Sequence, residues 1–370
     1  MHVTVVDPPA YTPPYDHALC TALAARGHDV ELATAVFRYA DLPEPEGYQR
    51  NECFYRRAGA GSAAKALSHP FDMLRLGWRL SRGPAGIVHF QWLPLPVADL
   101  ATVRAFPRPR VLTAHDLRPR EAGALTQRAW RRLLRDMDAV VAHSESGREQ
   151  LVSLGVPAGR THVIPHGAFH HLAVRRSDAA LDPAVGDLNG HRVVLFFGLL
   201  RPYKGVDTLI EAFAATPADT VLLIVGMPRM PIDALRRRAG ELGIADRIRW
   251  VTRFVPDAEA AAYFARADVV ALPYRETEQS GVLNTALAFG KALVLSDTGG
   301  FHEVSTEHGA ARLVPPGDGT ALGVALREVL EDDGERARLS EAARRAAAGP
   351  YSWSRAAELT ERLYRELMGS

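Results

Sequence analysis

From Val193 to Asp207 the chain reads VVLFFGLLRPYKGVD, and this stretch decides the fold. The five apolar residues predict a buried strand, Gly198 predicts a turn, and the residues after the turn lead into a helix. Strand, glycine turn and helix form the repeating unit of a doubly wound parallel sheet, in which ligands bind beyond the carboxyl ends of the strands. Two cations, Arg201 and Lys204, follow this strand. Such a turn is suited to bind an anion, especially a diphosphate, although on spacing alone two cations decorating an exposed turn are equally expected.

The same alternation of short β-branched runs and amphipathic helical patterns continues along the chain. It predicts strands near Val3–Val6, Val30–Ala33, Ile87–Phe90, Arg110–Thr113, Ala139–Ala142, His162–Ile164, Val193–Phe197, Thr220–Val225, Arg247–Val251, Val269–Leu272 and Ala292–Leu295. We therefore expect an α/β protein with two Rossmann-like, doubly wound parallel-sheet domains and a ligand site in the cleft between them. The expected boundaries are 1–173 for the first domain, 174–190 for a linker, 191–350 for the second domain and 351–370 for a final helix, with packing of that helix on the first domain as one option.

Charge and cysteine content exclude several classes of protein. Forty-four Lys and Arg residues against 43 Asp and Glu residues leave a net charge of +1, so no overall field steers the chain onto nucleic acid. Two cysteines, Cys20 and Cys53, are too few for a disulfide framework or a zinc cluster, which fits a reducing cytoplasm. No secretion signal precedes the first strand, and prolines interrupt the longest apolar stretch, Ile87–Val103. Any membrane contact is therefore expected to be peripheral, at the inner face.

Two basic helical stretches each contain a tryptophan. Trp78 lies beside Arg75 and Arg79, and Trp130 lies within an arginine-rich region. The arginines of that region are Arg118, Arg120, Arg128, Arg131, Arg132 and Arg135. A basic amphipathic helix with tryptophan can rest on an anionic surface. The alternative, a solvated face whose tryptophan reaches back into the core, is the one that the sequence favours.

A second chemistry-bearing stretch, PYRETEQSGVLNTALAFGK from Pro273 to Lys291, follows another predicted strand. A helix is expected to begin near Gly281, and the free N–H groups and dipole of its first turn would form a second anion-binding site. After the next strand come Gly299 and Gly300, for which turn chemistry is a sufficient explanation. The two anion-binding stretches are expected to converge on one ligand.

Taken together, these segments resemble the retaining glycosyltransferases of family 4, which have the GT-B architecture. The resemblance extends over nearly the whole chain, through Gly27–Val30, Thr113–Asp116, Ala142–Glu145, Val163–Gly167 and Trp353. It implies an acceptor domain followed by a donor domain. It also implies transfer of a hexosyl group from a UDP- or GDP-type sugar to a hydroxyl acceptor such as a glycan, a glycolipid or a small-molecule glycoside. No cofactor and no metal ion are expected, and the sequence lacks an Asp-x-Asp metal motif in the appropriate context.

The resemblance also assigns roles to individual residues. Lys204 and Arg201 would neutralise the donor diphosphate, together with the helix-terminal amides of Ser280, Gly281, Val282 and Leu283. Glu278, the first acid of the family's pair, would contact the transferred sugar with Gln279 beside it, and His115 would approach the same sugar. A core histidine bonded to backbone is the competing interpretation of His115, and His143 and His166 are expected to be structural.

Three positions depart from the family pattern. The second glutamate of the pair falls at Ala286, so the usual contact to the nucleotide ribose is missing. The commonest arginine position is Leu199, and Arg201 is expected to take its role. The glycine-rich loop after the first strand is replaced by the proline-rich segment 8–16, which should be stiffer.

Other functions stay open at this point. A sugar-nucleotide epimerase or a sugar phosphorylase would share the fold and the phosphate chemistry, and an epimerase would turn over its donor without an acceptor. A catalytically weak sugar-nucleotide-binding subunit is suggested by Ala286. A Rossmann dehydrogenase is disfavoured because no Gly-x-Gly-x-x-Gly follows the first strand.

Overall fold

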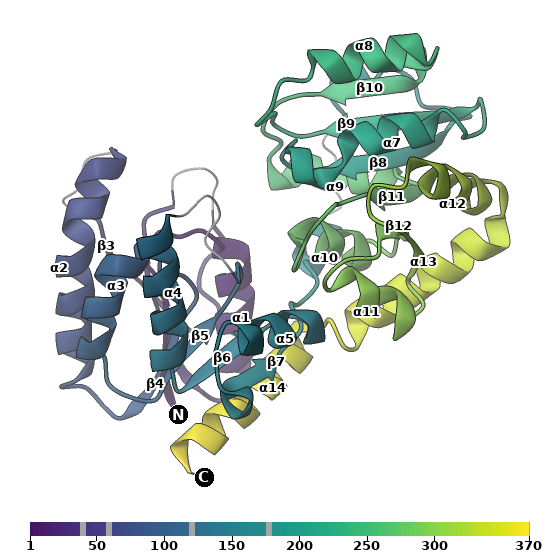
Figure 1. The fold of residues 1–370 in the computed structure, drawn as a ribbon. Coiled ribbons are helices and arrows are strands. Elements are labelled where there is room, and N and C mark those ends of the chain that lie inside the picture. Colours follow the sequence, from purple (N-terminus) through teal and green to yellow (C-terminus); the bar gives the residue numbers. More distant parts are fainter. Residues whose placement is uncertain (38–41, 57–60, 118–122, 175–179, 370) are drawn as a thin grey trace. The chain divides into compact units, whose positions relative to one another are not determined.

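The computed structural model describes residues 1–37, 42–56, 61–117, 123–174 and 180–369. Its internal contacts divide the chain into two compact units, one formed by Met1–His166 with Trp353–Ser370 and the other by Gly167–Ser352 (Figure 1). Each unit is built on one parallel sheet, seven-stranded in the first and six-stranded in the second. Two doubly wound α/β units were expected from the sequence, and this fold class is confirmed.

The first unit has the strand order β3-β2-β1-β4-β5-β6-β7. Its strands are β1 His2–Asp7, β2 Asp29–Ala35, β3 Gln49–Phe54, β4 Gly86–Phe90, β5 Arg110–Thr113, β6 Ala139–Ala142 and β7 Thr161–Val163. Its helices are α1 Pro13–Ala25, α2 Ser62–Leu80, α3 Pro96–Thr102, α4 Ala124–Asp136, α5 Glu145–Ser153 and α14 Trp353–Met368. The final helix, for which the sequence left the packing open, contacts α1 within this unit.

Successive residues along the strands point to opposite faces of this sheet. Val3 and Val5 belong to one buried cluster with residues of α1 and α14. Val6 and Val88 belong to another, formed with α2, α4 and α5. Because helices cover both faces, the strands read as continuous apolar runs rather than as alternating ones.

The proline-rich segment after β1 becomes the start of a helix. Pro13 and Pro14 occupy the first positions of α1, where the missing N–H of proline costs no hydrogen bond. The first turn also carries Asp16, a residue type favoured near a helix N-terminus in general. The residues that follow, including Leu19 and Leu23, are buried against the sheet.

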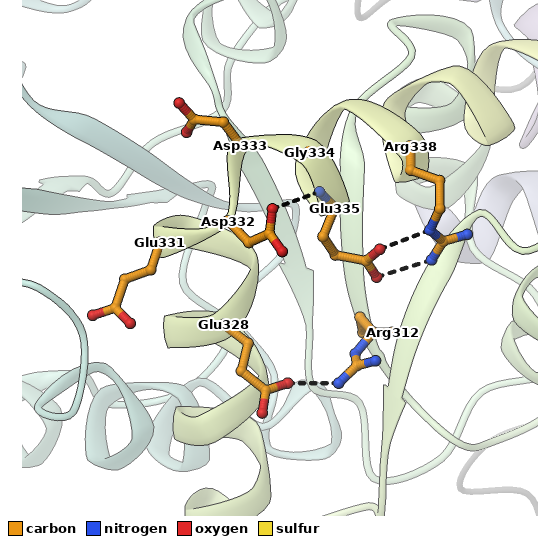
Figure 2. Close-up of a pocket in the computed structure, with 8 residues that line it drawn as sticks. All are labelled: Arg312, Glu328, Glu331, Asp332, Asp333, Gly334, Glu335 and Arg338. Atoms are coloured by element: carbon orange, nitrogen blue, oxygen red, sulfur yellow. Dashed lines mark hydrogen bonds and ion pairs between the residues drawn. The ribbon is translucent and has the colours of Figure 1, made fainter.

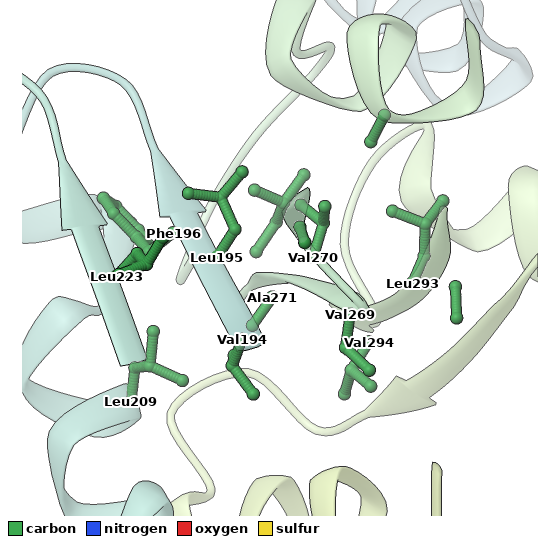
Figure 3. Packing of buried hydrophobic residues seen from close by; sticks show 14 of the residues in the cluster. Val194, Leu195, Phe196, Leu209, Leu223, Val269, Val270, Ala271, Leu293 and Val294 are labelled. Atoms are coloured by element: carbon green, nitrogen blue, oxygen red, sulfur yellow. The ribbon is translucent and has the colours of Figure 1, made fainter. Parts of the chain in front are cut away.

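The second unit has the strand order β10-β9-β8-β11-β12-β13. Its strands are β8 Arg192–Phe197, β9 Thr220–Val225, β10 Ile248–Val251, β11 Val269–Leu272, β12 Ala292–Ser296 and β13 Ala311–Val314. Its helices are α6 His170–Val174, α7 Val206–Phe213, α8 Asp233–Glu241, α9 Asp257–Arg266, α10 Gly281–Ala288, α11 Phe301–Thr306, α12 Gly319–Glu331 and α13 Asp333–Ala348. Figure 3 shows its core, in which Leu195, Val270 and Leu293 are neighbours in register on β8, β11 and β12.

Part of the expected linker contributes to this core. Val185 and Leu188 are buried in the cluster of the second unit, whereas residues 175–179 lie outside the described residues. Arg118 and Arg120 of the basic region also lie outside them. The sequence did not predict β3 or β13. The first of these is an edge strand whose half-buried, polar residues lack a strong strand pattern.

Two further observations concern the described residues only. None of their helices combines the length and the apolar character that crossing a bilayer requires. Cys20 and Cys53 are both free thiols.

Candidate active site

The two anion-binding stretches of the second unit meet above the end of β8. Gly198 has a φ of +109°, and a Cβ built on it would lie 2.9 Å from Nζ of Lys204 and 3.3 Å from the side chain of Val282. Any larger residue at Gly198 would therefore displace the Lys204 ammonium or the first turn of α10. The glycine allows the cation and the helix N-terminus to approach each other.

Lys204 is the most unusual side chain of this site. Only 8% of it is exposed, and its Nζ lies 4.9 Å from the centroid of the Tyr274 ring. Within the described part of the chain, its ammonium makes no ion pair or hydrogen bond. The Tyr274 ring attracts this ammonium, as aromatic faces attract cations in general. Among the described residues, no carboxylate therefore neutralises the Lys204 charge.

Arg201 and Arg275 differ in whether the chain already provides hydrogen-bond partners for the guanidinium. The guanidinium of Arg275 donates to the carbonyl oxygen of Pro202 and to Oδ2 of Asp207, both at 2.6 Å. It thus ties the two stretches together as part of the scaffold. Arg201, which precedes the short helical turn Pro202–Lys204, has no such partner among the described residues. Of these two arginines, Arg201 is the one available to a ligand.

Helix α10 presents its N-terminus to the same place. Ser280 caps it, with its Oγ accepting from the N–H of Leu283 at 3.4 Å, and the first turn leaves further N–H groups without intrahelical acceptors. Three buried polar atoms on this stretch have no hydrogen-bond partner in the part of the chain that the structure describes, namely the Tyr274 hydroxyl, Gln279 Oε1 and Asn284 Oδ1. Sequence reasoning missed Tyr274 and Asn284, because only burial reveals that their hydrogen-bonding groups are unsatisfied.

Glu278 is half-buried, and Gly299 and Gly300 contact the backbone at this position. Gly299 has a φ of +51°, and a Cβ on it would lie 1.9 Å from the carbonyl oxygen of Thr277. The N–H of Gly300 donates to the carbonyl of Glu278 at 3.4 Å. The sequence explained these glycines by the turn alone. The structure adds a second reason for glycine at 299, because the backbone of Thr277 leaves no room for a Cβ. The β12–α11 turn therefore positions the backbone that carries Glu278.

Ala286 faces away from this site. It is fully buried in the core cluster of the second unit, as is its neighbour Leu287. A carboxylate at this position would therefore enter the core instead of a ribose subsite. The missing glutamate at Ala286 leaves no gap in the ligand-facing surface of α10.

His115 lies in the first unit, just beyond the carboxyl end of β5. Its ring is nearly parallel to that of Trp92, with centroids 5.2 Å apart, and the edge of Tyr15 meets it at 4.7 Å. Its Nε2 lies 2.9 Å from the Gln91 side chain and its Nδ1 lies 3.2 Å from Nε2 of His143. Both partners are side chains, so His115 is not bonded to backbone as the competing interpretation required.

Burial determines the protonation of this pair. It lowers the pKa of His143 to about 4 and that of His115 well below its ordinary value, so both rings are neutral at pH 7. Neutral His143 donates from Nδ1 to the carbonyl of Ile164 at 2.9 Å, which leaves its Nε2 to accept from Nδ1 of His115. The bare Nε2 of His115 then requires the NH₂ end of the Gln91 amide opposite it. His115 is thus a neutral, oriented hydrogen-bonding group.

A pair of buried carboxylates lies near the same end of the sheet, at the end of β1 and in the first turn of α1. Burial raises the pKa of Asp7 to about 6, and burial together with the Asp7 charge raises the pKa of Asp16 well above its ordinary value. Each has one oxygen without a hydrogen-bond partner in the described structure. The pair therefore retains a proton at neutral pH, with Asp16 donating to Asp7. Sequence reasoning missed this pair, although an aspartate at a strand's carboxyl end was a signal.

A surface pocket of about 870 Å³ in the second unit is a weaker candidate. Figure 2 shows that its two arginines are paired, Arg312 with Glu328 and Arg338 with Glu335, while the rest of its charged lining is acidic. It therefore offers a ligand few uncommitted charges. In the described ranges, no three His, Cys, Asp or Glu side chains are grouped as ligands for a metal ion.

Comparison with known proteins identifies the family. Residues 15–168 match the model described as Glycosyltransferase Family 4, and residues 191–332 match the model described as Glycosyl transferases group 1. A phosphatidyl-myo-inositol mannosyltransferase of Mycobacterium tuberculosis is 30% identical over 368 residues, covering 95% of this chain and 92% of its own length. The chain belongs to glycosyltransferase family 4. It is therefore a glycosyltransferase by family.

Other members of the glycosyltransferase class show the same likeness. A D-inositol 3-phosphate glycosyltransferase of Xylanimonas cellulosilytica is 28% identical, covering 92% of this chain and 87% of its own. Among solved structures, sucrose-phosphate synthase from Thermosynechococcus elongatus has a TM-score of 0.78 at 21% identity, covering 100% and 99% of the two chains. Anabaena Alr3699/HepE in complex with UDP-glucose has a TM-score of 0.71 at 19% identity, covering 98% and 99%. These structures share the GT-B fold with this glycosyltransferase.

Proposed function

We propose that this glycosyltransferase moves a hexosyl group from a UDP- or GDP-type sugar to a hydroxyl acceptor, with retention of the anomeric configuration. The observation that carries the proposal is Lys204, a largely buried lysine that has no counter-ion among the described residues and lies beside the N-terminus of α10. Solved structures of similar fold that were determined with UDP or UDP-glucose support a nucleoside-diphosphate sugar as donor. Relatives named for inositol substrates support a hydroxyl acceptor, whether on a glycan, a glycolipid or a small-molecule glycoside.

Stabilisation of the leaving group is the main catalytic task in this proposal. The bond between the anomeric carbon and the diphosphate oxygen breaks, and negative charge grows on the phosphate. Lys204, Arg201 and the amides of the first turn of α10 offset that charge in a preorganised site. The acceptor oxygen bonds to the same face of the anomeric carbon, and its proton passes to the departing phosphate oxygen. Because the chain's own groups supply the positive potential, we propose that no divalent ion takes part.

The remaining site residues position the sugar. Glu278 and Gln279 would accept and donate hydrogen bonds to its hydroxyl groups, and the turn at Gly299 would keep them in place. His115 would contribute a neutral imidazole whose Nε2 exchanges the Gln91 amide for a sugar hydroxyl, without placing a second positive charge near the anomeric carbon. These residues orient the sugar and do not attack it.

A donor screen followed by product analysis tests the proposal. UDP-, GDP-, ADP- and TDP-sugars would be ranked by thermal shift, and the binding donor would then be incubated with candidate acceptors. We expect mass spectrometry to find a glycosylated product and NMR to find the donor's anomeric configuration in it. Turnover of donor alone to a second sugar nucleotide would indicate an epimerase. Tight nucleotide binding with neither transfer nor hydrolysis would indicate a binding subunit instead.

A further inference from the structure

Helix α2 of the first unit has two apolar faces, of which only one is covered. Met73, Leu76 and Leu80 are buried against the sheet in the core cluster. A second set is exposed, with exposed fractions of 75% for Leu67, 75% for Phe71, 46% for Leu74 and 60% for Trp78. The spacing of this set, i, i+4, i+7 and i+11, places all four on one side of the helix. We call these four residues the α2 stripe.

The stripe contrasts with the other tryptophan-bearing basic helix of the same unit. On α4, Trp130 is only 8% exposed, and its Nε1 donates to the carbonyl of Leu117 at 2.8 Å. The favoured sequence interpretation, a tryptophan that returns to the core, therefore holds for α4. It is wrong for Trp78, which lies outside the core. Large apolar side chains gathered on one exposed helix face mark an interaction surface more often than scattered ones do.

Basic side chains flank the stripe. The segment from α2 to the following turn carries Lys65, Arg75, Arg79 and Arg82 against a single acid, Asp72. The Arg82 guanidinium lies 4.0 Å from the centroid of the Trp78 ring, so a cation and an indole form one unit at the helix end. Arg79 pairs with Glu31 at 2.6 Å, and Arg75 lies 3.6 Å from Asp72. These four basic residues keep a net positive charge after Glu31 and Asp72 are counted against them.

The exposed apolar stripe and the basic side chains beside it together favour one kind of partner. A second copy of the chain would bring two flanks of like charge together, which costs energy at the rim of an interface. A bilayer with anionic lipids offers apolar depth for Phe71 and Leu67 and phosphates for the arginines, and tryptophan and arginine are suited to the headgroup region. We propose that the α2 stripe docks this glycosyltransferase onto the surface of a membrane rich in anionic lipid. The inference does not depend on the proposed donor or acceptor.

Sedimentation with sucrose-loaded vesicles tests the docking surface. We expect the full-length protein to sediment with vesicles of phosphatidylcholine and phosphatidylglycerol, but much less with phosphatidylcholine alone, and salt should weaken the binding. The double substitution Phe71→Ser with Trp78→Ser should lower the partition coefficient at least tenfold, because two aromatic side chains lose their burial. Both side chains are exposed, so the thermal unfolding midpoint should not change.

Matched variants separate this surface from the alternatives. Phe254→Ser removes a comparably exposed aromatic residue from the second unit and should leave vesicle binding unchanged. Arg128→Gln with Arg131→Gln removes exposed charges from α4 and should reduce binding less than Arg75→Gln with Arg82→Gln. Equal binding of the Phe71→Ser, Trp78→Ser protein and the wild type to anionic vesicles would overturn the proposal. So would failure of the wild type to bind them, or a dimer in analytical ultracentrifugation that the double substitution dissociates.

Discussion

Replacing Lys204 by methionine should separate catalysis from stability. The substitution keeps most of the side-chain volume and removes only the charge. If the ammonium acts as a preorganised charge for the departing diphosphate, its loss should raise the barrier by about 3 kcal/mol, roughly a hundredfold in kcat/KM. Arg201 and the amides of α10 remain, so the loss should be partial.

Stability should respond differently because no described residue forms an ion pair with this ammonium. Removing the ammonium breaks no ion pair with a described residue and loses the cation–π contact with Tyr274, worth about 1 kcal/mol. The free energy of unfolding should therefore stay within about 1 kcal/mol of the wild-type value. A lysine that held the loop together would instead show a clear loss of stability.

Initial rates with the donor found by screening, together with urea unfolding, provide the measurements. Arg275→Met is the matched control, because that guanidinium is already bound to Asp207 and should act through stability. Near-wild-type kcat/KM for Lys204→Met would refute the assignment of the diphosphate site. Equal losses of activity in the Lys204→Met and Arg275→Met proteins, both with reduced stability, would show that the stretch is only a scaffold.

Four further outcomes are expected. Activity should survive thorough EDTA treatment, since the chain's cations and a helix N-terminus supply the positive potential, and a strict, restorable Mg²⁺ or Mn²⁺ requirement would contradict this. Glu278→Gln should impair sugar transfer more than it weakens binding of the bare nucleoside diphosphate, which calorimetry measures, and equal losses would move the sugar subsite elsewhere. Because the pKa of Asp7 is raised from 3.8 to about 6 in the folded state, its contribution to stability is fully present below about pH 4 and is lost as pH rises through 6. The free energy of unfolding of Asp7→Asn relative to wild type, measured by urea unfolding, should then rise by about 2 kcal/mol between about pH 4 and about pH 7.5, and a flat difference would contradict the buried pair. Ala286→Glu should lower the thermal midpoint sharply by burying a charge in the core, whereas tighter nucleotide binding in a stable protein would show that position 286 faces the ligand.

The sequence by itself determined the two parallel-sheet units and located the glycine-bearing stretches that follow β8 and β11, because these features are local. A buried strand, a glycine turn and a helix start are read from adjacent residues, as between Val193 and Asp207. Where the local pattern is weak the prediction failed, as at β3, a polar edge strand. The resemblance to family 4 likewise rests on short motifs that do not need side-chain directions.

Only the tertiary structure decided which side of each element is covered. Trp78 and Trp130 sit in similar basic helical patterns, yet one is exposed and the other is buried, because different neighbours pack on α2 and α4. Ala286 enters the core although motif spacing placed it at a ligand. The surroundings of the Lys204 ammonium depend on Tyr274, which lies 70 residues further along the chain. Burial and partners come from residues far apart in the chain, so no local pattern contains them.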